Sequence, residues 1–69
     1  MTTIRLPEDW TRFLLTQPEQ GMGYQRVDVR LRDGRRIENA LVFNAEQLSV
    51  SEDVLPLNPR DIVDIVVAA

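Results

Sequence analysis

Three residue types that carry much of protein chemistry are missing from this chain: it has no cysteine, no histidine and no lysine. Without cysteine it cannot form disulfides or thiolate metal sites, and without histidine it lacks the commonest transition-metal ligand. A nucleophilic serine would also lack its usual activating base. The sequence therefore predicts no enzyme, no cofactor and no metal site.

Long apolar runs are absent as well. No stretch approaches the roughly 18 residues of a membrane span, and residues 1–9 do not join a basic segment to an apolar one, as a secretion signal does. The composition, 43% hydrophobic and 28% charged, is that of a globular domain. We therefore expect residues 1–69 to form a single small barrel domain, soluble in the cytoplasm and without membrane contact.

The first structural pattern is helical. Pro7 suits the first turn of a helix, Glu8 and Asp9 place negative charge at its N-terminus, and Pro18 cannot continue it. The pattern predicts a helix over residues 7–16. Apolar residues at helical spacing form one stripe, which we expect to pack on the core: Leu6, Trp10, Phe13 and Leu14.

Alternation of apolar and charged residues begins at Tyr24 and is typical of a half-buried strand. A second strand is expected over residues 35–43, with Phe43 among its core residues. Because a turn sequence lies between the two strands, we predict a hairpin over residues 24–43.

The turn of this hairpin contains Asp33 and Gly34. A two-residue loop would place Val29 opposite Glu38 and so mix core with surface. A three-residue loop, with Gly34 in the left-handed conformation, places Val29 opposite Ile37 instead. The sequence therefore predicts the three-residue, bulged turn.

The C-terminal third predicts short strands and turns. Residues 48–50 and 54–57 are expected to be extended, and residues 58–61 to form a turn capped by the Asn58 side chain. The last strand, residues 62–67, is apolar on both faces except at one aspartate, so we expect it to be central in the sheet or covered. Its candidate contacts with a second copy are Val63, Val66 and Val67.

The hairpin resembles the first motif of Sm-like proteins, in which alternating apolar residues lead to an Asp-Gly turn and a second apolar series ends in Phe-Asp or Phe-Asn. The resemblance implies a mainly β fold: a small SH3-like or Sm-like barrel of about five short antiparallel strands, preceded by one N-terminal helix. The matching residues lie within 27–44 and are Val27, Val29, Leu31, Asp33, Gly34, Arg35, Ile37, Leu41, Phe43 and Asn44.

The match stops where the RNA-binding residues of that family lie. Asn39 stands where Sm-like proteins usually have glycine, and Ala45-Glu46-Gln47-Leu48 replaces their usual Met-Asn type of contact. The second Sm motif, with its Arg-Gly pair, is missing, and Pro59-Arg60-Asp61 occupies that region. The resemblance therefore implies the fold and not an RNA site.

Basic residues are concentrated in the hairpin, because five of the eight arginines lie within residues 26–36 of a chain whose net charge is −3. In the bulged register Arg30 and Arg36 are expected to alternate with Asp28 and Glu38 as a compensated, solvated group. Three arginines then lack partners within the hairpin: Arg26, Arg32 and Arg35. Their expected counterparts are acidic groups elsewhere on this chain or on a second copy, and they are the candidate contacts for an anion or a partner.

Taken together, these patterns predict a non-catalytic interaction module or self-associating scaffold. Its expected partner is a second copy or another protein, since a small barrel with a doubly apolar last strand can pair along an edge. The alternative is a weak RNA- or phosphate-binding protein of the Sm-like type. An acidic chain repels nucleic acid at long range, so this alternative depends on a local basic patch.

Overall fold

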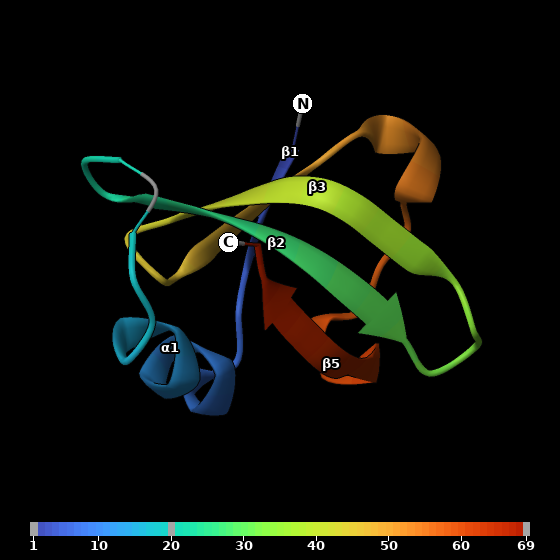
Figure 1. The fold of residues 1–69 in the computed structure, drawn as a ribbon. Helices are drawn as coiled ribbons and strands as arrows, with labels where there is room; N and C mark the ends of the chain where they lie inside the picture. The colour runs from blue at the N-terminus through green and yellow to red at the C-terminus, as the bar shows by residue number, and fades with distance from the viewer. Residues whose placement is uncertain (1, 20, 69) are drawn as a thin grey trace.

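The computed structural model describes residues 2–19 and 21–68. These residues form a mainly β structure with five antiparallel strands and one α-helix (Figure 1), which confirms the predicted fold class. The elements in chain order are β1 (Thr2–Arg5), α1 (Glu8–Leu15), β2 (Tyr24–Leu31), β3 (Arg36–Phe43), β4 (Gln47–Val50), the short 3-10 helices η1 (Glu52–Val54) and η2 (Pro59–Asp61), and β5 (Ile62–Val67).

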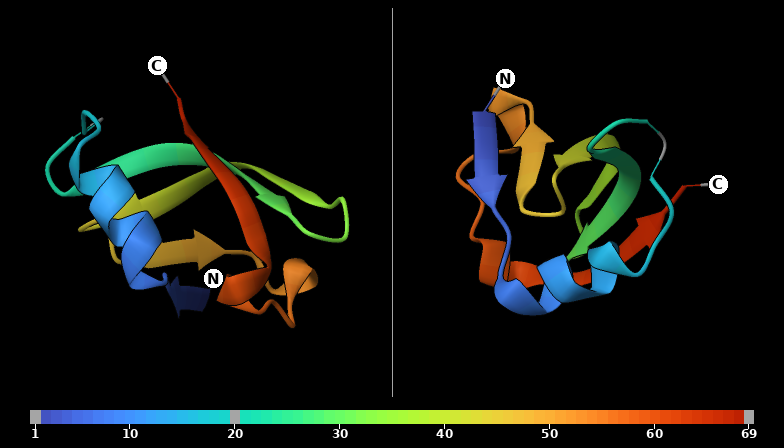
Figure 2. Two further views of the ribbon diagram at one scale, coloured as in Figure 1. Left: turned by 90° about the horizontal axis from the view of Figure 1, so that it is seen from below. Right: turned by 90° about the vertical axis from the view of Figure 1, so that its left-hand side faces the viewer.

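The five strands form one strongly curved sheet in the order β1-β4-β3-β2-β5 (Figure 2). Because β1 and β5 are its two edges and do not pair with each other, the sheet is open and does not close into the predicted barrel. The helix α1 packs on the concave side, where its Leu14 side chain is buried in the core.

One strand was missed by the sequence patterns and another was wrongly predicted. Thr2–Arg5 forms β1, which pairs antiparallel with β4. Residues 54–57 do not form a strand. Val54 ends the η1 turn, the residues after it belong to no strand, and Pro56 has no N–H to donate to a ladder. The edge beside β4 is therefore taken by the N-terminal strand.

The predicted three-residue turn between β2 and β3 is confirmed. Val29 pairs with Ile37, and the Leu31 N–H donates to the Arg35 carbonyl over 2.8 Å. Gly34 has φ of +94°, a left-handed conformation in which a side chain would be strained. The hairpin register near the turn therefore follows from the alternation of core and surface residues.

A second bulge, which the sequence analysis did not predict, lies in the middle of the hairpin. The register shifts between Val27 and Val29, where β3 contains one extra residue. Asn39 adopts φ of 60°, which asparagine tolerates better than most residues, and its N–H donates to the Asp28 carboxylate over 2.9 Å. Because side chains alternate along a strand, the extra residue exchanges the two faces of β3 beyond this point.

This exchange of faces overturns the prediction that Phe43 belongs to the core. Val42 is fully buried, whereas the Phe43 side chain is 37% exposed and pairs with Tyr24 on the outer face. The helical stripe is also only partly buried: Leu6 and Leu14 are core residues, Trp10 is half-buried, and Phe13 is exposed with its ring edge against Trp10.

The end of α1 is held by a buried polar side chain. Gln25 on β2 is only 2% exposed, and its amide donates to the carbonyls of Leu14 over 2.8 Å and Gln17 over 3.3 Å. These carbonyls lie at the C-terminal end of the helix, where backbone acceptors need partners from outside it. The helix agrees with the predicted residues 7–16 to within one residue at each end. None of the described helices is long and apolar enough to cross a membrane.

The C-terminal turn and strand follow the prediction in position. The Asn58 side chain accepts a hydrogen bond from the Arg60 N–H over 3.0 Å, capping η2, and β5 covers the predicted residues 62–67. However, β5 is an edge strand that pairs only with β2, and so it is not central.

The buried apolar residues form one cluster: Leu6, Leu14, Val27, Val29, Leu31, Ala40, Val42, Ala45, Leu48, Val50, Ile62 and Ile65.

Candidate functional site

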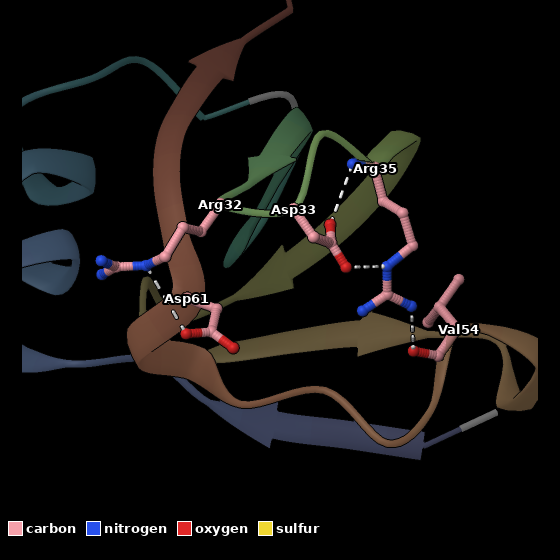
Figure 3. Close-up of polar contacts among 5 residues, drawn as sticks. All are labelled: Arg32, Asp33, Arg35, Val54 and Asp61. Atoms are coloured by element: carbon pink, nitrogen blue, oxygen red, sulfur yellow. Dashed lines mark hydrogen bonds and ion pairs between the residues drawn. The ribbon is translucent and has the colours of Figure 1, made fainter.

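The tip of the β2–β3 hairpin holds two of the three predicted contact arginines, and both have acidic partners (Figure 3). The Arg35 Nε lies 2.8 Å from Asp33 Oδ2, and its Nη1 donates to the Val54 carbonyl over 3.4 Å. Its guanidinium therefore joins the hairpin tip to η1. The main role of Arg35 is thus to connect two segments of the same chain.

Arg32 points away from Arg35, toward the start of β5 (Figure 3). Its Nε lies 3.8 Å from Asp61 Oδ1, and its backbone N–H donates to the Asp61 carbonyl over 2.8 Å. Because both side chains are largely exposed, this ion pair contributes little stability. Arg32 is thus partly compensated by an acidic group elsewhere on the same chain, which is the kind of counterpart expected for it.

Asp33 has a pKa below its ordinary value. The main cause is the hydrogen bond from the Arg35 backbone N–H to Asp33 Oδ1, 3.0 Å long, and the Arg35 guanidinium adds to it. A carboxylate with a depressed pKa stabilises the fold above its unfolded pKa, and this contribution is lost as the pH falls through the folded value. The contribution of Asp33 to the stability of the hairpin tip should therefore be lost in acid.

We expect the substitution Arg35→Gln to raise the pKa of Asp33 part of the way to its ordinary value, because the backbone donor stays while the guanidinium is lost. A carbon-detected NMR titration of the aspartate carboxyls measures this change. Arg32→Gln is the matched control, since Arg32 pairs with Asp61 and not with Asp33. An equal shift of the Asp33 pKa in both variants would contradict the assignment.

Arg26 lies on the outer face of β2, away from the hairpin tip. It is exposed, it pairs across the ladder with Leu41, and within residues 2–19 and 21–68 no carboxylate forms an ion pair with it. The aromatic pair Tyr24 and Phe43 lies next to it on the same face. The structure thus leaves Arg26 exposed and without an ion pair among the described residues, but separates it from Arg32 and Arg35.

Arg30 and Arg36 lie directly opposite each other on β2 and β3. The compensated group predicted for them does not form: the Asp28 carboxylate accepts the Asn39 N–H, and no ion pair to Arg30 or Arg36 occurs in the described part of the chain. These two arginines line a hollow of about 280 Å³ on the outer face. The other residues that line it are Asp28, Val29, Asp64 and Val66.

The three valines proposed for contact with a second copy lie in different environments. Val63 is 44% exposed and Val66 is 55% exposed, whereas Val67 is partly buried and packs against the core. The exposed pair lies on β5, whose side away from β2 has no strand partner among the described residues. Val63 and Val66 are thus available to a partner, and Val67 contributes mainly to the core.

Two polar residues with structural roles, Gln25 and Asn39, were not among the candidates predicted from the sequence. Gln25 falls on the core face of an alternating strand, in line with Val27 and Val29, and a polar residue at such a position signals a buried hydrogen-bonding group. Asn39 has φ of 60°, and asparagine adopts such a conformation more readily than most residues, so an asparagine inside a strand is a signal for a bulge. Both signals were present in the sequence.

Across the described residues there is no cluster of three or more histidine, cysteine, aspartate or glutamate side chains that could hold a metal ion. Comparisons of the chain with known protein families, with curated proteins and with solved structures gave no match.

Proposed function

We propose that the chain is a non-catalytic interaction module that associates with a second copy, or with another protein, through the open edge formed by β5. The observation that carries this proposal is the position of β5 at the end of the sheet, with two exposed valines. An unpaired edge with apolar side chains is a template for strand pairing. The cytoplasm is the compartment we propose for it.

The backbone of β5 supports pairing on this side. The Ala68 N–H donates to the Arg26 carbonyl over 2.8 Å, which places Ala68 at a hydrogen-bonded position of the β2–β5 ladder. Because such positions alternate in an antiparallel ladder, Ile65 and Val67 direct their own N–H and C=O groups away from β2. These groups are the donors and acceptors that an added strand would use.

The side chains of β5 offer little protection against pairing. Natural edge strands usually carry charged residues, often lysine, or proline, which discourage another strand from adding. In Ile62–Val67 the single charged residue is Asp64, and it is only partly exposed. The β5 edge therefore has the properties of an interface that pairs with another strand, and has few of the charged residues that protect an edge from pairing.

We also propose that the fold is related to the small SH3-like and Sm-like barrels. The positive φ of Asn39 supports this relation, because glycine, the usual Sm-like residue at that position, adopts such a conformation freely. The β2–β3 turn with Gly34 supports it as well. The N-terminal strand β1 lies outside the sequence resemblance, which begins at residue 27.

We expect the chain to form dimers or larger assemblies as its concentration rises, and the double variant Val63→Lys with Val66→Lys to remain monomeric. Two lysines on the edge add charge where a partner strand would lie. Light scattering coupled to size exclusion, over a range of concentrations, measures both. Leu15→Lys is the matched control, because Leu15 is an exposed apolar residue on α1.

A wild-type chain that stays monomeric at all concentrations would overturn the proposal, as would equal dissociation in the Leu15→Lys control.

The alternative function, weak binding of RNA or phosphate, is supported by the outward pair of Tyr24 and Phe43 beside Arg26. In that case the chain stays monomeric, and its affinity for single-stranded RNA falls as salt rises.

A further inference from the structure

The hollow on the outer face of β2, β3 and β5 is lined by two arginines whose position suggests an anionic ligand. Arg30 and Arg36 are directly opposed across the β2–β3 ladder, and both are exposed. Like charges at directly opposed positions destabilise a sheet. We propose that this hollow binds a phosphate group between the two guanidinium groups.

The electrostatic contrast with the other arginines supports this assignment. Four arginines have a carboxylate partner in an ion pair: Arg5, Arg12, Arg32 and Arg35. Arg30 and Arg36 have none within the described residues, although each guanidinium carries five N–H donors. An anion between them offsets their repulsion and uses these donors.

The two aspartates of the hollow limit the affinity without removing the site. Asp28 is engaged by the Asn39 N–H over 2.9 Å, so its carboxylate is oriented toward the bulge. Asp64 pairs with Arg30 across the β2–β5 ladder, yet their charged groups form no ion pair. Because Asp64 also repels an anion, we expect weak binding, with a Kd on the order of 1 mM.

Phosphate is the chemical class that suits two adjacent guanidinium groups. The planar fork of arginine donates two parallel hydrogen bonds to phosphate oxygens, and a tetrahedral dianion can accept from two forks at once. A carboxylate presents only two oxygens in one plane and a single negative charge. The ligand is thus a phosphate group, either free or carried by a phosphorylated side chain.

An NMR titration of the whole chain with inorganic phosphate tests the proposal, with chloride at matched ionic strength as reference. We expect saturable shifts of the amides of Arg30, Arg36 and Val66. Arg30→Gln or Arg36→Gln should weaken binding by about tenfold, the equivalent of about 1.4 kcal/mol. Either substitution should also raise the Tm slightly without phosphate, because it removes the opposed like charges.

Arg12→Gln and Arg32→Gln are the matched controls, since they remove the same charge outside the hollow. Asp64→Asn should strengthen binding, because it removes the opposing carboxylate. Equal weakening in the controls, or no saturable shift, would overturn the site. The titration is run on Val63→Lys as well, together with light scattering, since Val63 lies on the β5 edge but does not line the hollow. Phosphate binding by a Val63→Lys chain that has lost self-association shows that the two properties are separate.

A phosphoserine peptide, compared with its unphosphorylated form, distinguishes the two sources of the phosphate group. Tighter binding of the phosphopeptide than of inorganic phosphate supports a phosphorylated protein partner. Equal binding supports a free or small phosphate ligand. Binding of both peptides with equal affinity would contradict recognition of the phosphate group.

Discussion

Replacing Val42 with aspartate is expected to unfold the chain, whereas Phe43→Asp, at the next residue, should leave it folded. Val42 is fully buried, and a charge placed there without a partner costs several kcal/mol. A domain of 69 residues has a total stability of about 3–10 kcal/mol, so that cost is comparable to all of it. Phe43 is 37% exposed on the outer face, and its loss should cost on the order of 1–2 kcal/mol.

Circular dichroism and urea unfolding of the two variants measure this difference. The comparison tests the bulge at Asn39, because a hairpin without that extra residue would bury Phe43 and expose Val42. A folded Val42→Asp variant together with an unfolded Phe43→Asp variant would show that the face assignment is reversed. Size exclusion distinguishes a soluble unfolded chain from an aggregate.

The substitution Gln25→Leu should lower the free energy of unfolding by about 1–3 kcal/mol. Leucine is close to glutamine in size, so the effect comes from the lost amide and not from a cavity. The Leu14 carbonyl, 2.8 Å from the Gln25 amide, would be left without that donor at the buried end of α1. We also expect the last turn of α1 to lose protection in hydrogen exchange.

Gln47→Leu is the matched control for this substitution. Gln47 is also a strand glutamine, but its side chain is exposed, so the same change should alter stability by less than about 0.5 kcal/mol. Urea unfolding followed by Trp10 fluorescence measures both variants. Equal stability of Gln25→Leu and the wild-type chain would show that the helix end does not depend on the Gln25 amide.

The arginines of the hairpin fall into two groups with different roles. Arg32 and Arg35 at the tip are tied to acidic or carbonyl groups of the same chain. Arg26, Arg30 and Arg36 lie on the outer face without ion pairs in the described regions. A contact with an anion would therefore form on the face of the sheet, and the tip would serve mainly to hold the hairpin against η1 and η2.

Local patterns in the sequence determined much of the fold. The β2–β3 turn, the pairing of Val29 with Ile37, the cap at Asn58 and the bounds of β5 all follow from side-chain alternation, turn chemistry and capping. These features depend on residues close in the chain, so no knowledge of distant contacts is needed. The strand β1 was missed because only four residues form it, and the evidence for it lies in β4.

Other features were decided only by the tertiary structure. The register shift at Asn39 depends on the Asp28 carboxylate across the ladder, and it alone determines that Val42 is core and Phe43 is surface. Whether an arginine is paired depends on which acidic residue the folded chain brings near it, as Asp61 comes to Arg32. The sequence by itself thus determined the strands β2, β3, β4 and β5 and the turn between β2 and β3. The strand β1, the faces of β3 beyond Asn39, the open edge and the unpaired arginines required long-range contacts, because a one-residue shift or a distant carboxylate reverses them.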